Sequence, residues 1–178
     1  MSDFVTNLRT PLSKEQVVAL KAGDQVLISG TVYTARDMAH KRLCELLDAG
    51  RELPVDLEGA VIYFVGPTPA RPGRIIGSAG PTTASRMDPF SPALIGRGLR
   101  AMIGKGCRNK QVREALQRFG AVHLAAVGGA GALLANHIVA SEVVAWPELG
   151  TEALRKLELV DFPAVVAYDA HGKSIYNE

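Results

Sequence analysis

The sequence predicts a single α/β domain with a mixed sheet, and two observations support this. Short runs of β-branched and apolar residues alternate with amphipathic segments along most of the chain, a pattern typical of strands and helices packed in layers. The sequence has no repeat, low-complexity tract or interior linker. We therefore expect one domain spanning residues 1–178.

Composition and charge exclude several classes of protein. The chain has 20 Lys and Arg against 18 Asp and Glu, for a net charge of +2, which does not favour a dedicated nucleic-acid or membrane binder. No apolar run approaches the roughly 20 residues of a membrane span, and no basic-then-apolar leader opens the chain. The two cysteines, Cys44 and Cys107, lie far apart without CxxC spacing, as in proteins of reducing compartments. We expect a soluble, cytoplasmic protein.

The first third predicts an extended segment, two helices and a strand. Residues 1–12 read as extended chain. Ser13 caps a short helix, with Gln16 as its capping-box partner. A β-branched run over residues 24–34 predicts a strand, and apolar spacings of three and four predict a helix over 35–49.

The middle of the chain predicts short elements joined by tight turns. The apolar run 60–66 indicates a strand covered on both faces, and a proline-rich turn at 67–73 leads to a short strand over 74–77. Further on, we expect a helix over 92–100 and a strand over 101–104.

The last third continues the alternation. Asn109 caps a helix that ends before Gly120. The later elements are a strand over 121–127, a small-residue helix over 128–138, a strand over 139–145, a helix over 151–159 and a strand over 162–169.

One loop, Gly77–Asp88, concentrates the features of an anion site. Gly80 and Pro81 shape a rigid backbone, while threonines, a serine and Arg86 supply hydrogen-bond donors. Guanidinium groups and carboxylates match as two-pronged partners, so we expect the anion to be a carboxylate.

Other candidate groups lie outside this loop. Arg36 and His40 are four residues apart on one helix side, and Lys105 stands between two glycines at a strand end. Together with Arg86 these cations suit a dicarboxylate, and His40 or an activated threonine could move a proton. Two plainer alternatives stay open: His40 as an ordinary boundary histidine, and each cation as surface charge. These residues resemble half of an active site.

The glycines at 128–131 do not form a dinucleotide fingerprint. The run lacks G-x-G-x-x-G spacing and the acidic residue that should follow it. A nucleotide-binding domain is therefore poorly supported, and close packing is the expected use of these small residues.

Four motifs in order bear a specific resemblance. Thr34–Arg42, Gly66–Pro69, Gly80–Pro89 and Gly104–Gly106 resemble the beta subunit, or C-terminal domain, of the iron–sulfur class I fumarate hydratases and L(+)-tartrate dehydratases. The resemblance covers residues 12–176.

This resemblance implies a fold, a cofactor and a partner. It implies a swivelling β/β/α domain that closes over a [4Fe–4S] cluster held by three cysteines of an alpha subunit, in an α2β2 heterotetramer. With only two cysteines in this chain, the cluster is expected on the partner. The reaction implied is the reversible hydration of fumarate to (S)-malate, with a cluster iron as Lewis acid on the substrate hydroxyl.

The resemblance also implies roles for five residues. Arg36, Arg86 and Lys105 match positions that bind substrate carboxylates, and Thr82 matches a threonine proposed as the base. His40 matches a histidine treated as an active-site residue in the tartrate enzymes.

Three alternatives to a fumarate hydratase subunit remain. L(+)-tartrate dehydratase and mesaconate hydratase beta subunits share the motifs, although Ala35 and Asp88 are more typical of the fumarate branch. Ala84-Ser85 departs from the family's usual pair without shifting Thr82 or Arg86 out of register. Outside the enzymes, a non-catalytic carboxylate-binding module would carry the same cations.

Overall fold

The computed structural model describes residues 5–127 and 129–177, so the predictions for residues 1–4 and Gly128 lie outside the described residues. The strands are β1 (Val5–Arg9), β2 (Gln25–Thr34), β3 (Val61–Tyr63), β4 (Ala101–Gly104), β5 (Val122–Ala125), β6 (Ile138–Ala145) and β7 (Leu154–Tyr168). The helices are α1 (Lys14–Ala19), α2 (Asp37–Asp48), α3 (Ser91–Ile95), α4 (Lys110–Phe119) and α5 (Gly131–Ala135), with 3₁₀ turns η1 (Ala84–Met87) and η2 (Pro147–Glu152).

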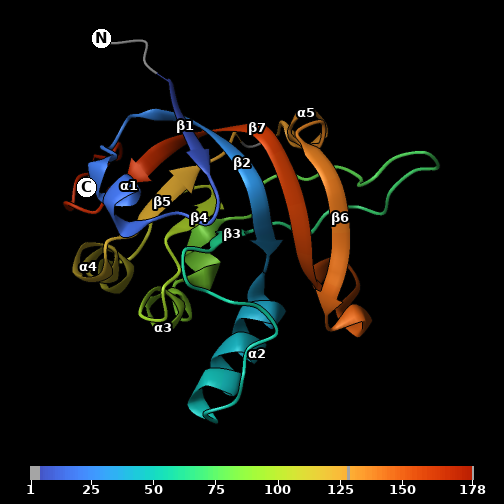
Figure 1. The fold of residues 1–178 in the computed structure, drawn as a ribbon, viewed down its shortest axis with the longest axis horizontal. Helices are drawn as coiled ribbons and strands as arrows, with labels where there is room; N and C mark the ends of the chain where they lie inside the picture. Colours follow the sequence, from blue (N-terminus) through green and yellow to red (C-terminus); the bar gives the residue numbers. More distant parts are fainter. Residues whose placement is uncertain (1–4, 128, 178) are drawn as a thin grey trace.

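Five strands close into a mixed barrel in the order β2-β3-β4-β5-β7, with β7 pairing back to β2. The pairs β2–β3, β3–β4 and β4–β5 are parallel, whereas β7 runs antiparallel to both of its barrel neighbours. Strand β1 extends the sheet beside the first half of β2, and β6 pairs with the first half of β7. Figure 1 shows β7 arching over the barrel with β6 at the sheet's outer edge.

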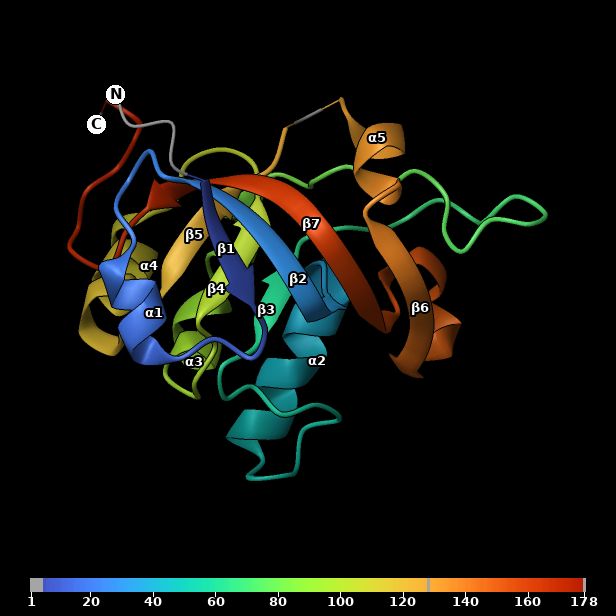
Figure 2. The same ribbon diagram turned by 45° about the horizontal axis from the view of Figure 1, so that its top comes forward.

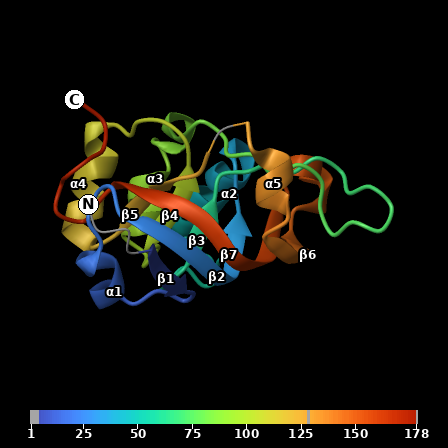
Figure 3. The same ribbon diagram turned by 90° about the horizontal axis from the view of Figure 1, so that it is seen from above.

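Two apolar cores follow from the alternation of side chains along the strands. Inward residues such as Tyr63, Ile103 and Phe162 pack together in one cluster. Their neighbours on the opposite face, such as Ile62 and Met102, pack with the apolar faces of α2, α3 and α4. These helices lie together on one side of the sheet (Figure 1), and α5 lies apart from them beside β6 (Figures 2 and 3). This arrangement confirms the predicted α/β class and mixed sheet.

Several local predictions are confirmed. Ser13 and Gln16 form the capping box of α1, and Asn109 caps α4, which ends at a left-handed Gly120. The single strand β2 spans the predicted 24–34 run, with a register shift next to Gly30. None of the described helices is long and apolar enough to cross a membrane.

Several predicted elements are wrong or shorter than expected, and the strands over 60–66 and 121–127 and the helix over 128–138 shrink to β3, β5 and α5. The helix predicted over 151–159 is instead η2 followed by the first part of β7. Its Leu, Glu and Lys residues favour helix locally, but β2 on one side and β6 on the other satisfy their backbone as strand. Residues 74–77 form no strand, because Arg74 donates to the carbonyl of Arg71 within a turn and Gly77 donates to the carbonyl of Thr68 across the loop. Helix α3 ends at Ile95, earlier than predicted.

The inward residues of β7 should carry much of the stability. Phe162 is fully buried and packs edge-on against Tyr63 with 5.2 Å between ring centroids, whereas Val160 is 47% exposed. Phe162→Ala should lower the free energy of unfolding by about 3–5 kcal/mol because it leaves a cavity. Val160→Ala, two residues away, should cost less than about 1 kcal/mol. Urea denaturation measures both; equal losses would contradict this assignment of inside and outside.

Candidate active site

Arg36 lies at the junction of β2 and α2. It is the N-cap residue of α2 in an extended conformation, so its side chain leaves the helix at the first turn. A Cβ built on Gly66 would lie 2.7 Å from Nη1 of Arg36 and 3.0 Å from Cδ. The guanidinium therefore lies against the bare backbone of Gly66, which only a glycine permits, and its Nε has no partner among the described residues.

Thr82 lies between the ends of β3 and β4. Its amide donates to the carbonyl of Phe64 (2.7 Å), and its carbonyl accepts from the amide of Lys105 (3.2 Å). The amide of Ala84 then donates to the carbonyl of Lys105 (2.8 Å), and Thr83 forms a parallel bridge with Lys105. The loop thus continues the sheet at the carboxyl ends of parallel strands, where ligands of α/β sheets bind.

Arg86 is held in place by Asp37. Its Nε and Nη2 donate to the two carboxylate oxygens of Asp37 at 3.1 and 2.8 Å. The pair is partly exposed, so it adds little stability. It does tie η1 to the first turn of α2, next to Arg36.

A chain of contacts through backbone atoms and neighbouring residues therefore joins the four predicted residues other than His40. Thr82 bonds to Phe64 and Lys105, Arg36 packs on Gly66 two residues after Phe64, and Arg86 binds the neighbour of Arg36. Lys105 is exposed and forms no ion pair with a described acidic residue. This arrangement places Thr82 and three cationic residues at one edge of the barrel.

His40 lies behind this edge rather than on it. The ring is completely buried against Phe64 and Phe90, and Nδ1 lies 2.9 Å from the carbonyl oxygen of Arg36. A carbonyl only accepts, so Nδ1 carries the proton and Nε2 is left without a described partner. Burial lowers the pKa of His40 to about 4, so the ring is neutral at neutral pH.

Two features of the site were missed in the sequence. Asp37, the carboxylate that orients Arg86, follows Arg36 directly and gave only the signal of an acidic first helical turn. Arg108 and Asp88 form a buried ion pair behind Lys105 and η1, and no sequence spacing connects two residues so far apart.

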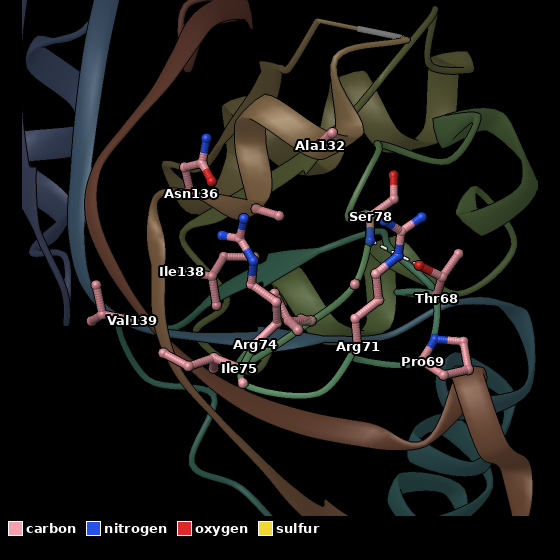
Figure 4. Close-up of a pocket in the computed structure, with 14 residues that line it drawn as sticks. Thr68, Pro69, Arg71, Arg74, Ile75, Ser78, Ala132, Asn136, Ile138 and Val139 are labelled. Carbon is pink, nitrogen blue, oxygen red and sulfur yellow. Dashed lines mark hydrogen bonds between the residues drawn. The ribbon is translucent and has the colours of Figure 1, made fainter.

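A cavity of about 530 Å³ lies elsewhere, between the loop 68–78 and the elements α5 and β6. In Figure 4 the side chains of Arg71 and Arg74 rise from this loop toward Ser78 and Asn136. None of the five predicted residues lines this cavity. Beside it the chain is closely packed, since a Cβ on Gly131 would lie 2.8 Å from the amide nitrogen of Gly80. The expected packing role of the small residues around α5 is confirmed for Gly131.

The described residues of this chain do not fit an iron–sulfur cluster. They contain no group of three or more His, Cys, Asp or Glu placed to hold a metal ion. Cys44 is partly buried and Cys107 exposed, each as a free thiol.

The chain belongs to a known class of protein domain. The family model described as "Fumarase C-terminus" matches residues 3–178, so the chain belongs to the fumarase C-terminal family.

Its relatives include proteins named as fumarate hydratases and one named as an L(+)-tartrate dehydratase subunit. The "Putative L(+)-tartrate dehydratase subunit beta" of Methanocaldococcus jannaschii is 40% identical over 94% of this chain and 89% of its own length. The anaerobic class I fumarate hydratase of Escherichia coli is 41% identical over 85% of this chain but only 28% of its own. The fumarate hydratase 2 of Leishmania major is 36% identical over 97% of this chain and 31% of its own length. This chain thus spans about a third of the fumarate hydratases it matches.

The buried histidine predicts a dependence of stability on pH. The unfolded chain takes up a proton at His40 near pH 6.5, whereas the folded chain does so only near pH 4. The stabilisation is therefore complete above pH 6.5 and is lost as the pH falls toward 4, by about 3 kcal/mol in all. Burial also lowers the pKa of His123, so this histidine contributes to the pH dependence with the same sign. NMR titration of the His40 ring should find it neutral at pH 5.5; half-protonation near pH 6.5 would contradict its burial.

Proposed function

We propose that this chain is the beta subunit of a two-subunit hydro-lyase of the fumarate hydratase type, which interconverts (S)-malate with fumarate and water. The contact chain from Arg36 through Thr82 to Lys105 carries the proposal, because it brings these cationic residues to the same edge of the barrel as Thr82. Family membership supports it, as does the relative named a beta subunit that this chain nearly covers.

The alpha partner is part of the proposal. The relative that this chain covers over 89% of its length is named a subunit beta, which supports an alpha partner that supplies the part of the class I fumarate hydratases that this chain does not match. That chain would hold the [4Fe–4S] cluster, since the described residues here do not fit one. We further propose an α2β2 heterotetramer in the cytoplasm.

Each predicted residue has a role in this scheme. Arg36, Arg86 and Lys105 bind the two substrate carboxylates through charge-assisted hydrogen bonds. The deprotonated hydroxyl of Thr82 takes the proton from C3 of malate as the C2 oxygen leaves as hydroxide, and return of that proton to the hydroxide gives water and restores the base. A free threonine hydroxyl is a weak base, so the surrounding cations must favour its deprotonated form in the closed site.

His40 fits a positioning role better than proton transfer. Its ring is buried, and its Nδ1–H donates to the carbonyl of Arg36. That hydrogen bond fixes the first turn of α2, from which Arg36 and Asp37 project. The proton-transfer role suggested by the resemblance stays a prediction.

L(+)-tartrate dehydratase is the second candidate, because the relative that this chain covers almost completely carries that name. Mesaconate hydratase would use the same cations. Assays of the anaerobically reconstituted complex with malate, L(+)-tartrate and methylfumarate separate the three. Turnover of tartrate without malate would assign the chain to the tartrate branch.

Loss of the Thr82 hydroxyl tests catalysis against mere binding. In the reconstituted complex, Thr82→Ala should lower kcat by about 10²–10⁴-fold, the usual contribution of a positioned base. Thr83→Ala, an exposed neighbour in the same loop, should leave kcat near wild type. Undiminished turnover by Thr82→Ala would favour the non-catalytic carboxylate-binding module.

Gly66 offers a test of Arg36 without changing its charge. Gly66→Ala should push the Arg36 guanidinium from its place, since the new Cβ would meet Nη1 at 2.7 Å. KM for the dicarboxylate should rise about 10-fold or more, the worth of a charged hydrogen bond. Gly96→Ala, whose Cβ would meet only ordinary contacts of 3.5 Å and beyond, is the control. An unchanged KM in Gly66→Ala would remove Arg36 from the site.

A further inference from the structure

We propose that the buried ion pair between Asp88 and Arg108 is a positioning clamp that fixes the loop carrying Thr82 and Arg86 against the loop carrying Lys105. Its consequence for catalysis rests on the proposed function, whereas the clamp itself is a property of this chain.

Both members of the pair lie within three residues of predicted site residues. Asp88 follows Arg86 by two positions, and Arg108 follows Lys105 by three. Nε of Arg108 donates to Oδ1 of Asp88 at 2.7 Å, and Oδ2 accepts from the amide of Asn109 at 2.8 Å. Each carboxylate oxygen thus ties the end of η1 to the chain that leads from Lys105 into α4.

The rest of the guanidinium extends the connection. Nη2 of Arg108 donates to Oγ of Ser91 (2.6 Å), which in turn donates to the carbonyl of Met87 (2.9 Å) at the end of η1. The guanidinium carbon also lies 5.3 Å from the ring centroid of Phe64, whose carbonyl binds the amide of Thr82. The network therefore reaches Phe64, which binds Thr82, and Met87 at the end of η1 in the loop that carries Thr82.

The backbone of Arg108 is anchored as well. Its amide donates to the Tyr168 hydroxyl at 3.1 Å, and Nη1 lies 3.3 Å from Nδ1 of His123. Both partners belong to the barrel strands β7 and β5. These contacts attach Arg108 to strands of the barrel rather than to another loop.

Stability alone does not account for such a pair. The side chain of Arg108 is fully buried and that of Asp88 is 7% exposed. Removing two charges from water costs about as much as their attraction returns, and apolar residues of similar volume often serve stability equally well. Apolar contacts are not directional, whereas the hydrogen bonds of this pair are, and directional bonds can fix the distance between two loops.

The loop that carries Lys105 is held to the Thr82 loop through its backbone. Glycines flank Lys105 on both sides, and Gly106 has a φ of +87° and open space where a Cβ would lie. Two backbone bonds connect it to the Thr82 loop: the amide of Lys105 donates to the carbonyl of Thr82, and the amide of Ala84 donates to the carbonyl of Lys105. The amides of Ala84 and Lys105 therefore report on the clamp.

Hydrogen exchange of the full chain tests the clamp without reference to activity. In the double variant Asp88→Leu/Arg108→Met, the amides of Ala84 and Lys105 should exchange about 10-fold faster or more. The amide of Val122, which binds the carbonyl of Arg100 in the barrel, should change less than about twofold. The melting temperature should stay within about 3 °C of wild type, because no unpaired buried charge is left.

Two exchange results would overturn the clamp. Unchanged exchange at Ala84 and Lys105 would show that the pair does not hold the loops. Equal acceleration at Val122 with a lower melting temperature would show an ordinary structural role. Ser91→Ala removes one arm and leaves no unpaired charge, so it should accelerate the two loop amides in the same direction even if the double variant fails to fold.

Kinetics of the complex with the alpha partner test the consequence for the site. The double variant should lower kcat by about 10-fold or more and raise KM for malate, since misplacement by about 1 Å can cost 10²-fold. Lys110→Gln/Glu114→Gln removes an exposed ion pair of α4 and should change neither constant. Faster loop exchange with wild-type kinetics would overturn the positioning role. A wild-type complex inactive on all three dicarboxylates would instead refute the proposed function, and the exchange result would still decide the clamp.

Discussion

The backbone hydrogen bonds on either side of Thr82 are the constraint on which the site depends. Through its amide the loop joins the end of β3, and through its carbonyl it joins the chain leaving β4. Parallel strands bring their carboxyl ends to one edge, but they leave the loops that follow free to diverge. By taking the place of another strand between those two ends, the segment around Thr82 gathers groups from three separate loops into one surface.

The barrel makes this surface rigid. Because β7 pairs with both β2 and β5, the sheet closes and the ends of β2, β3 and β4 cannot spread apart. Arg36 then leaves β2, Thr82 lies against β3 and Lys105 leaves β4. Groups that must meet two carboxylates gain most from such fixed spacing, because a preorganised site loses little freedom on binding.

Local signals in the sequence were enough to predict several of the helices. Capping residues such as Ser13 and Asn109, and the apolar spacing of α2, predict their elements correctly because the interactions lie within four residues. The helix predicted over 151–159 failed because pairing with β2 and β6 outweighed helix propensity. Distant contacts such as Asp88 with Arg108, and the burial of His40 against Phe64, depend on the whole fold and leave no spacing to detect. The family resemblance supplied proposed roles for residues that local patterns left as scattered cations.

In our proposal the cations and the hydroxyl form one wall of a site, and a partner chain supplies the other. Its central claim is that these cations bind the dicarboxylate. Calorimetric titration of malate into the anaerobic complex tests this directly, with Arg36→Gln compared with Arg97→Gln, an exposed arginine outside the site. The account predicts a Kd about 10-fold weaker or more for Arg36→Gln, the worth of a charge-assisted hydrogen bond, and no change for Arg97→Gln. Equal affinity in both variants would contradict it.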